Sequence, residues 1–299
     1  MLTISSSFCL YSETKTEIKG YVDWETMMMK AEFSLDLTSA GLKLPAGRTQ
    51  AESLLKSNYL NLMRPFLLEL QVDSSSTIGD LIARDEFTMI QADSIALGSN
   101  TIPSYMQPDM RKISEAHTIM LSAFSSLLIS HSRPAQVIRT LTPVSSAAYT
   151  GIIIIASDEQ PVHAMRGSAL PVPCLFPKIW DSEMNLIYER GTVEPRNIAM
   201  VHYAPLKNIF QNNPSGLTPA LQQIVGTKPM KIFARGVFGE KPTDLIIDQR
   251  DALTIISSEE NRRLLAQGKV VIVLDDSALR YEFGASSSQT QLGTSVGRY

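Results

Sequence analysis

Four histidines are the first residues in this sequence that could do chemistry, either as metal ligands or as general bases. They are His117, His131, His163 and His202, and no two of them have the i,i+2 or i,i+4 spacing that brings two imidazoles to one metal ion. His117 and His131 bracket an apolar stretch and are expected at strand ends or on the surface. His163 follows Pro161 in a predicted loop, and His202 is expected to face solvent on a strand. The histidines therefore predict no metal site.

Carboxylates form three groups that could serve acid–base catalysis or hold a cation. The groups are Asp73, Asp80, Asp85 and Glu86; Asp181, Glu183 and Glu189; and Asp275 with Asp276. Serines and threonines beside the first group favour caps and turns, the second lies in a predicted hairpin with a solvated edge, and nothing near the third completes a site. Arg48 and Arg64 could bind an anion, but a solvated helix face is the preferred interpretation. One enzyme hypothesis stays open, a cell-wall hydrolase with Asp181, Asp244 and Asp275 at strand ends.

The two cysteines and the glycines give no stronger indication of chemistry. Cys9 and Cys174 are too few for a disulfide framework or a metal pair; Cys174 is expected to be buried, and a lipid-acceptor role is one alternative for Cys9. Gly236 and Gly239 suggest a phosphate loop, but Pro242 and a strand follow them instead of a helix, which favours a bulge or a turn. The sequence has no P-loop or dinucleotide fingerprint. We therefore predict no catalytic, cofactor-binding or metal-binding residues, and no cofactor.

Periodicity and capping residues predict the elements that would position these groups in the first half of the chain. Thr49 with Glu52 is a capping-box pair that predicts the start of a helix, and Pro65 predicts a break in it. Thr77 with Asp80 predicts a second cap. The remaining elements expected here are a strand at 21–37, a turn at 41–47, a loop at 98–108, and strands at 117–130 and 137–141.

The second half of the chain reads as alternating strands and short helices. Gly151 heads a run of four isoleucines, which is typical of a strand buried on both faces. The expected strands are 151–156, 173–179, 184–189, 198–203, 230–238, 243–247 and 269–274. A short helix is expected at 217–225, another after the N-cap Asp248, and a third that Ser258 with Asn261 begins and Gly268 ends.

Length, composition and charge predict a globular protein with a buried core. The chain has 299 residues, of which 44% are hydrophobic and 19% charged. Its net charge of -3 argues against a general nucleic-acid binder, and no run approaches the ~18 apolar residues that a membrane helix needs. We expect an α+β fold of mixed β-sheets with flanking helices. The predicted parts are a leader at 1–20, an N-terminal α+β domain at 21–133, a C-terminal mixed-sheet domain at 134–276 and a flexible tail at 277–299.

The first twelve residues allow two interpretations. Leu2, Ile4, Phe8 and Leu10 are apolar, serines dilute them, and no charge occurs before Glu13. A secretory signal begins with a basic region, so this stretch reads as the second half of such a signal without its basic start. The alternative is an ordinary frayed N-terminus.

Two blocks of the sequence carry a family resemblance. The first consists of residues 149–153, 175–181 and 186–188, and the second of residues 232–237, 243–247 and 261–274. Over residues 148–275 they resemble bacterial envelope proteins related to the LPP-type outer-membrane lipoproteins and the flagellum-associated lipoproteins. The resemblance implies an exported α+β protein on the periplasmic side, in general without known catalytic residues, so it supplies no site residue.

The leading expectation is therefore a non-enzymatic, exported envelope protein with a structural or assembly role beside the flagellar or outer-membrane machinery. Its partners would be envelope proteins, including further copies of itself, with a peripheral or lipid-anchored contact to the membrane and no nucleic acid. The alternative is a ligand- or partner-binding periplasmic module with a groove formed by Phe176, Trp180, Tyr188 and Tyr203. The location would be periplasmic or outer-membrane-associated, and cytoplasmic if Met1 is the mature start.

Overall fold

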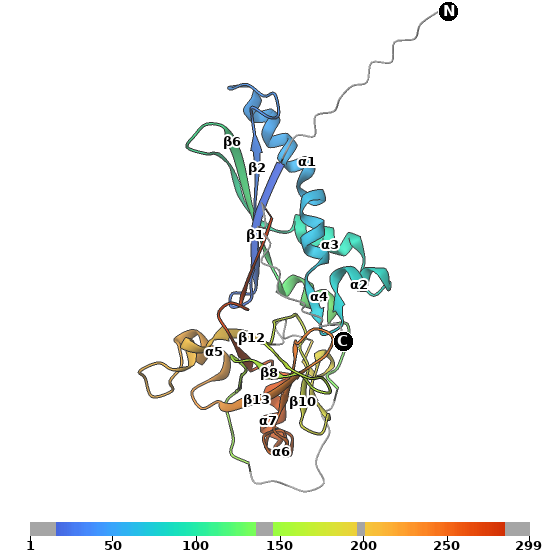
Figure 1. Ribbon diagram of the computed structural model, residues 1–299, viewed down its shortest axis with the longest axis vertical. Coiled ribbons are helices and arrows are strands. Elements are labelled where there is room, and N and C mark those ends of the chain that lie inside the picture. Colours follow the sequence, from blue (N-terminus) through green and yellow to red (C-terminus); the bar gives the residue numbers. More distant parts are fainter. Residues whose placement is uncertain (1–15, 136–145, 196–200, 285–299) are drawn as a thin grey trace, which may run out of the picture.

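The computed structural model describes residues 16–135, 146–195 and 201–284. They form an α+β fold with two domains, each built on its own sheet, as the sequence predicts. Figure 1 shows the N-terminal domain above the C-terminal domain, joined at a narrow waist.

The N-terminal domain is an antiparallel sheet with helices on one face. Its strand order is β16 (Arg280–Gly284), β1 (Thr16–Asp23), β2 (Met28–Asp36), β6 (Lys112–Met120) and β5 (Asn100–Met106). The helices are α1 (Gly47–Leu68), α2 (Ile78–Ala83), α3 (Met89–Leu97) and α4 (Ser122–Leu128). The helices cover one face of this sheet (Figure 1). Met29 and Phe33 of β2 are buried in the core that the sheet shares with the helices, whereas Lys30 between them is exposed.

The C-terminal domain is a mixed sheet of seven strands. Their order is β11 (Leu186–Tyr188), β10 (Ile179–Asp181), β14 (Asp244–Ile247), β13 (Met230–Phe238), β7 (Ile152–Ile155), β15 (Val270–Leu274) and β12 (His202–Pro205). Ile152 and Ile154 pack into the core that contains α6 (Gln249–Ser257) and α7 (Glu259–Ala266). Ile153 and Ile155 pack into a second core with α5 (Pro219–Val225). The prediction that this strand is buried on both faces is confirmed.

Short elements complete the fold. They are the hairpin of β3 (Gln71–Asp73) and β4 (Ser76–Thr77), the hairpin of β8 (Gln160–Pro161) and β9 (Ser168–Ala169), and the 3-10 turns Arg190–Thr192 and Leu206–Ile209. No helix among the described residues has the length and apolar character needed to span a bilayer.

Several predicted elements in the first half differ from the structure. Helix α1 begins at Gly47 and continues through Pro65, because its buried stripe, which includes Leu55, Met63 and Leu67, outweighs one missing backbone donor. Thr49 caps nothing there, since the N-cap is Ala46 and no side chain caps it. The prediction of a cap at Thr77 is confirmed.

Two stretches have a secondary structure different from the one predicted from the spacing of their apolar residues. Residues 98–108 were expected to be a loop, but most of them form β5. The strand expected at 117–130 ends at Met120, and residues 122–128 form α4, in which Phe124 and Leu128 are buried one helical turn apart. Short apolar runs fit either period, so tertiary packing decided between them.

The ends of the predicted domains and two of the predicted strands also differ. Strand β1 begins at Thr16, inside the expected leader, and Arg280–Gly284 of the expected tail form β16. The strand expected at 173–179 is reduced to β10, which starts at Ile179. The strand expected at 137–141 and the start of the one expected at 198–203 lie outside the described residues.

Candidate functional site

An apolar pocket of about 350 Å³ lies where the two domains meet, and we call it the interdomain pocket. Three parts of the chain line it. The N-terminal domain supplies Val22, Trp24, Phe66, Glu69, Leu70 and Gln71; the C-terminal domain supplies Val172, Pro173, Lys241 and Pro242; and the segment after β15 supplies Ser277, Ala278, Arg280, Tyr281 and Phe283. Small-molecule sites have volumes of roughly 300–1,000 Å³, are mostly apolar and favour domain interfaces. The interdomain pocket fits all three criteria.

The wall contributed by the N-terminal domain consists of the end of β1 and the last turn of α1. Val22 is 5% exposed on the side of the sheet that faces the helices, and Leu70 just after α1 is 4% exposed. Phe66 lies on the last turn of α1, and its ring stacks on that of Phe283 with the centroids 4.3 Å apart. Apolar side chains from three elements therefore shape this wall.

Trp24 lines the pocket and also contacts residues of the C-terminal part of the chain. Its backbone N–H donates to the carbonyl of Leu279 at 2.9 Å, and its ring meets Tyr203 edge to face at 5.8 Å. The Tyr203 hydroxyl donates to the carbonyl of Cys174 at 2.8 Å and accepts from the Cys174 N–H at 3.1 Å. Burial raises the pKa of the Tyr203 hydroxyl and that of the Cys174 thiol, so both groups stay protonated at neutral pH.

A buried carboxylate, Asp244, binds the two domains together below the pocket. It accepts hydrogen bonds from Ser74 Oγ at 3.2 Å, Trp180 Nε1 at 3.3 Å, and the backbone N–H of Lys178 and Oγ1 of Thr243, each at 3.2 Å. Ser74 belongs to the N-terminal domain and the other three donors to the C-terminal domain. Burial raises the pKa of Asp244, although these hydrogen bonds oppose the shift.

Backbone hydrogen bonds continue this contact along the β3–β4 hairpin. The N–H groups of Leu175 and Phe176 donate to the carbonyls of Gln71 and Val72, at 3.1 and 2.7 Å. The N–H of Lys241 donates to the carbonyl of Ser74 at 2.8 Å. The hairpin therefore holds residues on both sides of the pocket in fixed positions.

A second polar cluster, which sequence reasoning missed, lies inside the N-terminal domain. Nδ1 of His117 is 2.9 Å from Ser99 Oγ, and its Nε2 is 3.2 Å from Glu115 Oε1. Tyr59 stacks on the imidazole at 3.9 Å, and Phe33 packs edge-on at 5.5 Å. The expectation that His117 lies on the surface is wrong, since it is 7% exposed in the middle of β6.

A serine, a histidine and a glutamate in this order are the residue types of a nucleophile with its general base. In this protein, however, Tyr59 and Phe33 pack against the imidazole, and burial lowers its pKa. Glu115 Oε2 has no hydrogen-bond partner among the described residues. We interpret the cluster as a polar network of the core. The i,i+2 spacing of Glu115 and His117 on one strand was the only signal in the sequence.

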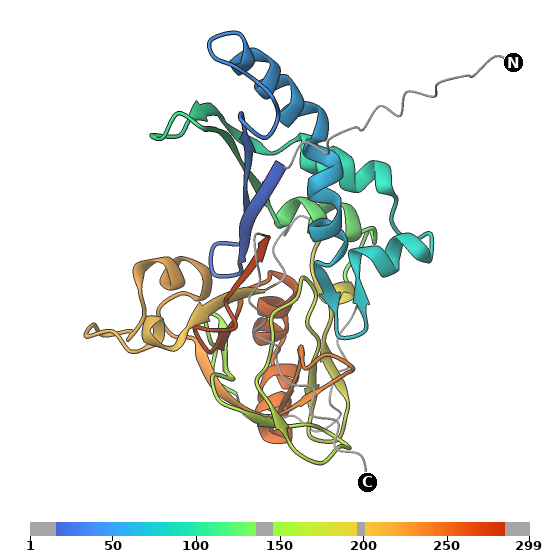
Figure 2. The same cartoon turned by 45° about the horizontal axis from the view of Figure 1, so that its top comes forward.

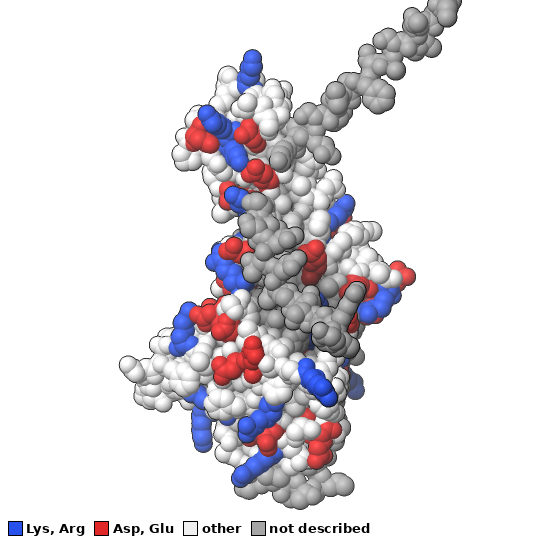
Figure 3. Space-filling view, viewed as in Figure 1, with Lys and Arg blue, Asp and Glu red and all other residues white. Residues whose placement is uncertain are grey.

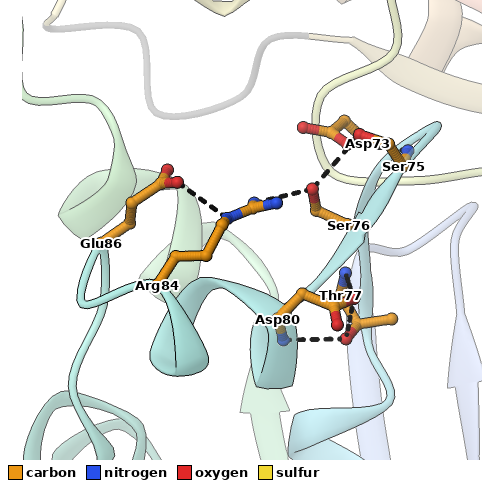
Figure 4. Close-up of polar contacts among 7 residues, drawn as sticks. All are labelled: Asp73, Ser75, Ser76, Thr77, Asp80, Arg84 and Glu86. Atoms are coloured by element: carbon orange, nitrogen blue, oxygen red, sulfur yellow. Dashed lines mark hydrogen bonds and ion pairs between the residues drawn. The ribbon is translucent and has the colours of Figure 1, made fainter.

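The first predicted group of carboxylates is divided among local contacts (Figure 4). Asp73 accepts from the N–H and hydroxyl of Ser75, at 2.9 and 3.1 Å, and Asp80 forms the capping box with Thr77. Glu86 pairs with Arg84 at 2.9 Å, and Arg84 also donates to Ser76 Oγ at 2.8 Å. The preference for caps and turns is confirmed for Asp73 and Asp80.

The other predicted carboxylates also have local roles. Asp181 is 4% exposed, so the expected solvated edge is wrong; it accepts from the N–H groups of Glu183 and Asn185, at 2.9 and 2.8 Å, and closes the hairpin turn. Asp275 accepts from Ser277, and Asp276 pairs with Lys207 at 3.3 Å. Glu189 caps the 3-10 turn that follows it.

The three aspartates of the hydrolase hypothesis do not meet. Asp181 ends β10, while Asp244 begins the neighbouring parallel strand β14. Asp275 follows β15, and the strands β13 and β7 separate β14 from β15. The structure therefore places the three carboxylates at different positions around the sheet.

The aromatic residues that were expected to form a groove are part of the core instead. Phe176, Tyr188 and Tyr203 are at most 3% exposed, and Trp180 binds Asp244 through its Nε1. Phe176 also meets the guanidinium of Arg190 at 5.4 Å. The groove predicted from these side chains is wrong, because three of them are buried and Trp180 is half-buried, and none of the four lines the interdomain pocket.

The remaining candidates are dispersed. Arg48 pairs with Glu52 at 3.0 Å and Arg64 with Asp93 at 2.7 Å, as expected for a helix surface. His163 is exposed. His202 is half-buried on β12, so the expectation that it faces solvent is wrong, and this burial lowers its pKa. Cys174 is buried as predicted, and His131 contacts the carbonyl of Val193. Gly236 lies at a bulge of β13, and Gly239 lies at a bend with φ of 107°.

Two properties of the described residues complete the site. No three His, Cys, Asp or Glu side chains among them gather as the ligands of a metal ion would. On the face shown in Figure 3, positive and negative side chains are interspersed over both domains.

The fold and the pocket define a two-domain α+β protein with an apolar interdomain site. Residues 15–127 match a family model described as the N-terminal domain of Treponema pallidum Tp0624, and residues 151–276 match the model of the second domain of the same protein. The chain is thus similar to two successive domains of that protein, in the same order. No curated protein matches this chain. Neither family model refers to LPP-type lipoproteins, so that resemblance stays a prediction.

Proposed function

We propose that this chain is a non-enzymatic, exported protein of the bacterial envelope that holds a small apolar ligand in the interdomain pocket. The observation that carries the proposal is the pocket itself, with its volume of about 350 Å³ and its lining of Val22, Trp24, Phe66 and Leu70. A pocket of this volume holds a small molecule or an alkyl chain. It is too small to be the binding site of a folded protein, because a protein–protein interface buries a much larger surface area.

The polar clusters support the non-enzymatic part of the proposal. Asp244, Asp181 and the pair of Glu115 with His117 are at most 7% exposed and are engaged with neighbouring groups of the protein. A general acid or base has to reach the proton that it transfers. The position of these groups favours a binding protein over an enzyme.

The envelope location depends on the leader-like residues 1–12 and on the resemblance to envelope lipoproteins, and it has its own test. Fractionation of the native protein, with mass spectrometry of its mature N-terminus, is expected to find a processed or acylated terminus in the envelope fraction. Recovery of the protein in the cytosol with an intact Met1 would contradict this location and leave the pocket proposal standing.

Ligand binding can be measured with N-phenyl-1-naphthylamine, an uncharged apolar probe whose fluorescence rises when it leaves water. Ala278 lines the pocket, so Ala278→Phe fills it, while Ala148→Phe makes the same change at an exposed position. We expect saturable binding by the wild type and by Ala148→Phe, and at least tenfold weaker binding by Ala278→Phe. Equal binding by all three proteins would place the probe elsewhere and overturn the proposal.

An assembly role remains the second candidate, and the free edge of the N-terminal sheet favours it. Strand β5 is an edge strand on which Ile102 is 58% exposed, and Ile90 and Leu97 on α3 are 81% and 66% exposed. Exposed strand edges and apolar side chains are typical of surfaces that associate. Self-association through this edge predicts that Ile102→Lys shifts the protein toward the monomer in light-scattering measurements, whereas Lys19→Ala on β1 does not.

A further inference from the structure

One wall of the interdomain pocket is made by a short segment that returns from the C-terminal domain, residues 277–284, which we call the return segment. It supplies five of the fifteen residues that line the pocket. The segment leaves the C-terminal sheet after β15 and ends as β16 on the edge of the N-terminal sheet, beside β1 (Figure 2). The pocket therefore closes only when this segment is docked.

The strand of the return segment is held by few side-chain contacts. Of the five residues of β16, only Phe283 is buried, and Tyr281 is 56% exposed although it lines the pocket. Among the strands that the structure describes, its backbone pairs with β1 alone, from Lys19↔Gly284 to Asp23↔Arg280. Elements with few buried apolar contacts and an open edge detach at low free-energy cost compared with the core.

Phe283 is the side chain that fixes β16 to the domain. Its ring stacks on Phe66 and lies directly over Gly20 of β1. A Cβ at Gly20 would lie 2.4 Å from the backbone oxygen of Lys30 on β2 and 2.5 Å from two carbons of the Phe283 ring, so both the pairing with β2 and the docked ring require glycine here. On the opposite face of the sheet, the Arg280 guanidinium lies 3.7 Å from the ring of Tyr21 and adds a weaker contact. Phe283 is thus the buried anchor of β16, while Leu279, which is 5% exposed and accepts the Trp24 N–H, fixes the segment just before the strand.

We propose that the return segment is a strap that gates the interdomain pocket: β16 detaches from β1 to admit a ligand and docks again over it. This inference rests on the proposed ligand-binding function. A ligand in contact with Tyr281 and Phe283 stabilises the docked strand, and by linkage docking of the strand raises the affinity of the pocket for the ligand. The docked strand also closes the wall through which the ligand would leave, which slows its escape. Occupancy of the pocket therefore also strengthens the tie between the two domains.

The gate is tested by locking the strap in place. Tyr21 and Glu282 are register partners on β1 and β16, so Tyr21→Cys with Glu282→Cys, in a Cys9→Ser background, can join the two strands by a disulfide. Stopped-flow fluorescence with N-phenyl-1-naphthylamine then compares the oxidised and reduced forms of the same protein. We expect association and dissociation to slow at least tenfold on oxidation and to recover on reduction.

A second variant loosens the strap. Phe283→Ala is expected to speed association several-fold and to raise amide hydrogen exchange in residues 279–284, while the amides of β2 stay protected. Saturating probe should lower exchange of residues 279–284 in the wild type.

The outcomes separate the two proposals. Probe binding at equal rates in the oxidised and reduced forms, with Phe283→Ala unchanged, would overturn the gate and leave the binding function intact. Absence of probe binding in every form, including the wild type, would overturn both.

Discussion

At the scale of single residues, this protein contains more buried polar chemistry than its sequence indicates. Asp244, Asp181, Glu115 and His117 are all nearly inaccessible, and each is engaged with hydrogen-bonding groups of the protein. A buried polar group without a partner costs far more than a hydrogen bond contributes. These residues therefore tie elements together, and their energetic roles can be measured.

Asp244 gives the first prediction. Asp244→Asn keeps the shape of the side chain but turns one acceptor into a donor that faces Ser74, Lys178 or Trp180. We expect a loss of about 1–3 kcal/mol in the free energy of unfolding, measured in urea. The exposed Asp158→Asn is the matched control and should change it by less than about 0.5 kcal/mol. Equal changes in the free energy of unfolding for Asp244→Asn and Asp158→Asn would show that the hydrogen bonds of Asp244 do not stabilise the fold.

His117 gives a prediction for pH. Burial lowers its pKa and outweighs the opposing effect of Glu115, and burial lowers the pKa of His202 as well. Below the ordinary histidine pKa of about 6.5, the unfolded chain binds protons that the folded chain does not. The free energy of unfolding therefore has its full value above that pH and decreases as the pH drops through the lowered pKa of the folded state. His117→Gln should therefore lose less stability than the wild type between pH 7.5 and pH 5.0 in urea unfolding. His163→Gln, at an exposed site, should keep the wild-type slope.

At the scale of elements, local sequence signals were reliable where the chain itself supplies the hydrogen bond. Thr77 and Asp80 form the predicted capping box of α2, and Asp248 and Ser258 cap α6 and α7. Thr49 with Glu52 has the same pattern but lies inside α1, where Glu52 pairs with Arg48 instead. A motif of this kind predicts a cap only where packing lets the helix begin.

This contrast can be tested with two identical substitutions. Thr77→Ala removes the acceptor for the Asp80 N–H and should cost about 1 kcal/mol of stability, as the loss of an N-cap does. Thr49→Ala should change stability by less than about 0.5 kcal/mol, since its side chain is exposed and caps nothing. Chemical denaturation measures the free energy of unfolding of both variants. A larger loss for Thr49→Ala than for Thr77→Ala would contradict the observed start of α1.

At the scale of the whole molecule, the two domains are joined by more than their linker. The β3–β4 hairpin binds residues 175, 176 and 241, Asn208 Nδ2 donates to Glu25 Oε1 at 2.8 Å, and β16 returns to the first sheet. Contacts of this kind couple the unfolding of two domains, because unfolding one domain removes hydrogen-bond and packing partners from the other. We expect a single cooperative transition.

The two tryptophans allow this coupling to be measured, since Trp24 lies in the first domain and Trp180 in the second. Single-tryptophan variants, Trp24→Phe and Trp180→Phe, should report coincident midpoints in urea. Gly239 has φ of 107°, and a Cβ there would lie 2.4 Å from the Cβ of Ser74. Gly239→Ala should therefore push the hairpin away and separate the two midpoints. Coincident midpoints in that variant would show that the hairpin does not couple the domains.

The sequence by itself determined the α+β class, the strand of isoleucines at 152–155 and the caps at Thr77, Asp248 and Ser258. These features depend on periodicity and on hydrogen bonds between residues close in the chain. It also determined that Cys174 is buried. The helix α4 and the strand β5 were missed because short apolar runs fit two periods, and only packing against the rest of the domain selects one.

Only the tertiary structure decided the site. The pocket brings together Val22, Phe66, Val172, Lys241 and Phe283, which no motif or spacing connects. Strand β16 has one buried side chain and no strong pattern, so its place depends on the free edge of β1 and on the space above Gly20. Long-range pairing and burial depend on the partner surface as much as on the segment. For that reason the sequence predicts the secondary structure of many single segments, but it does not predict the pocket that forms between distant segments.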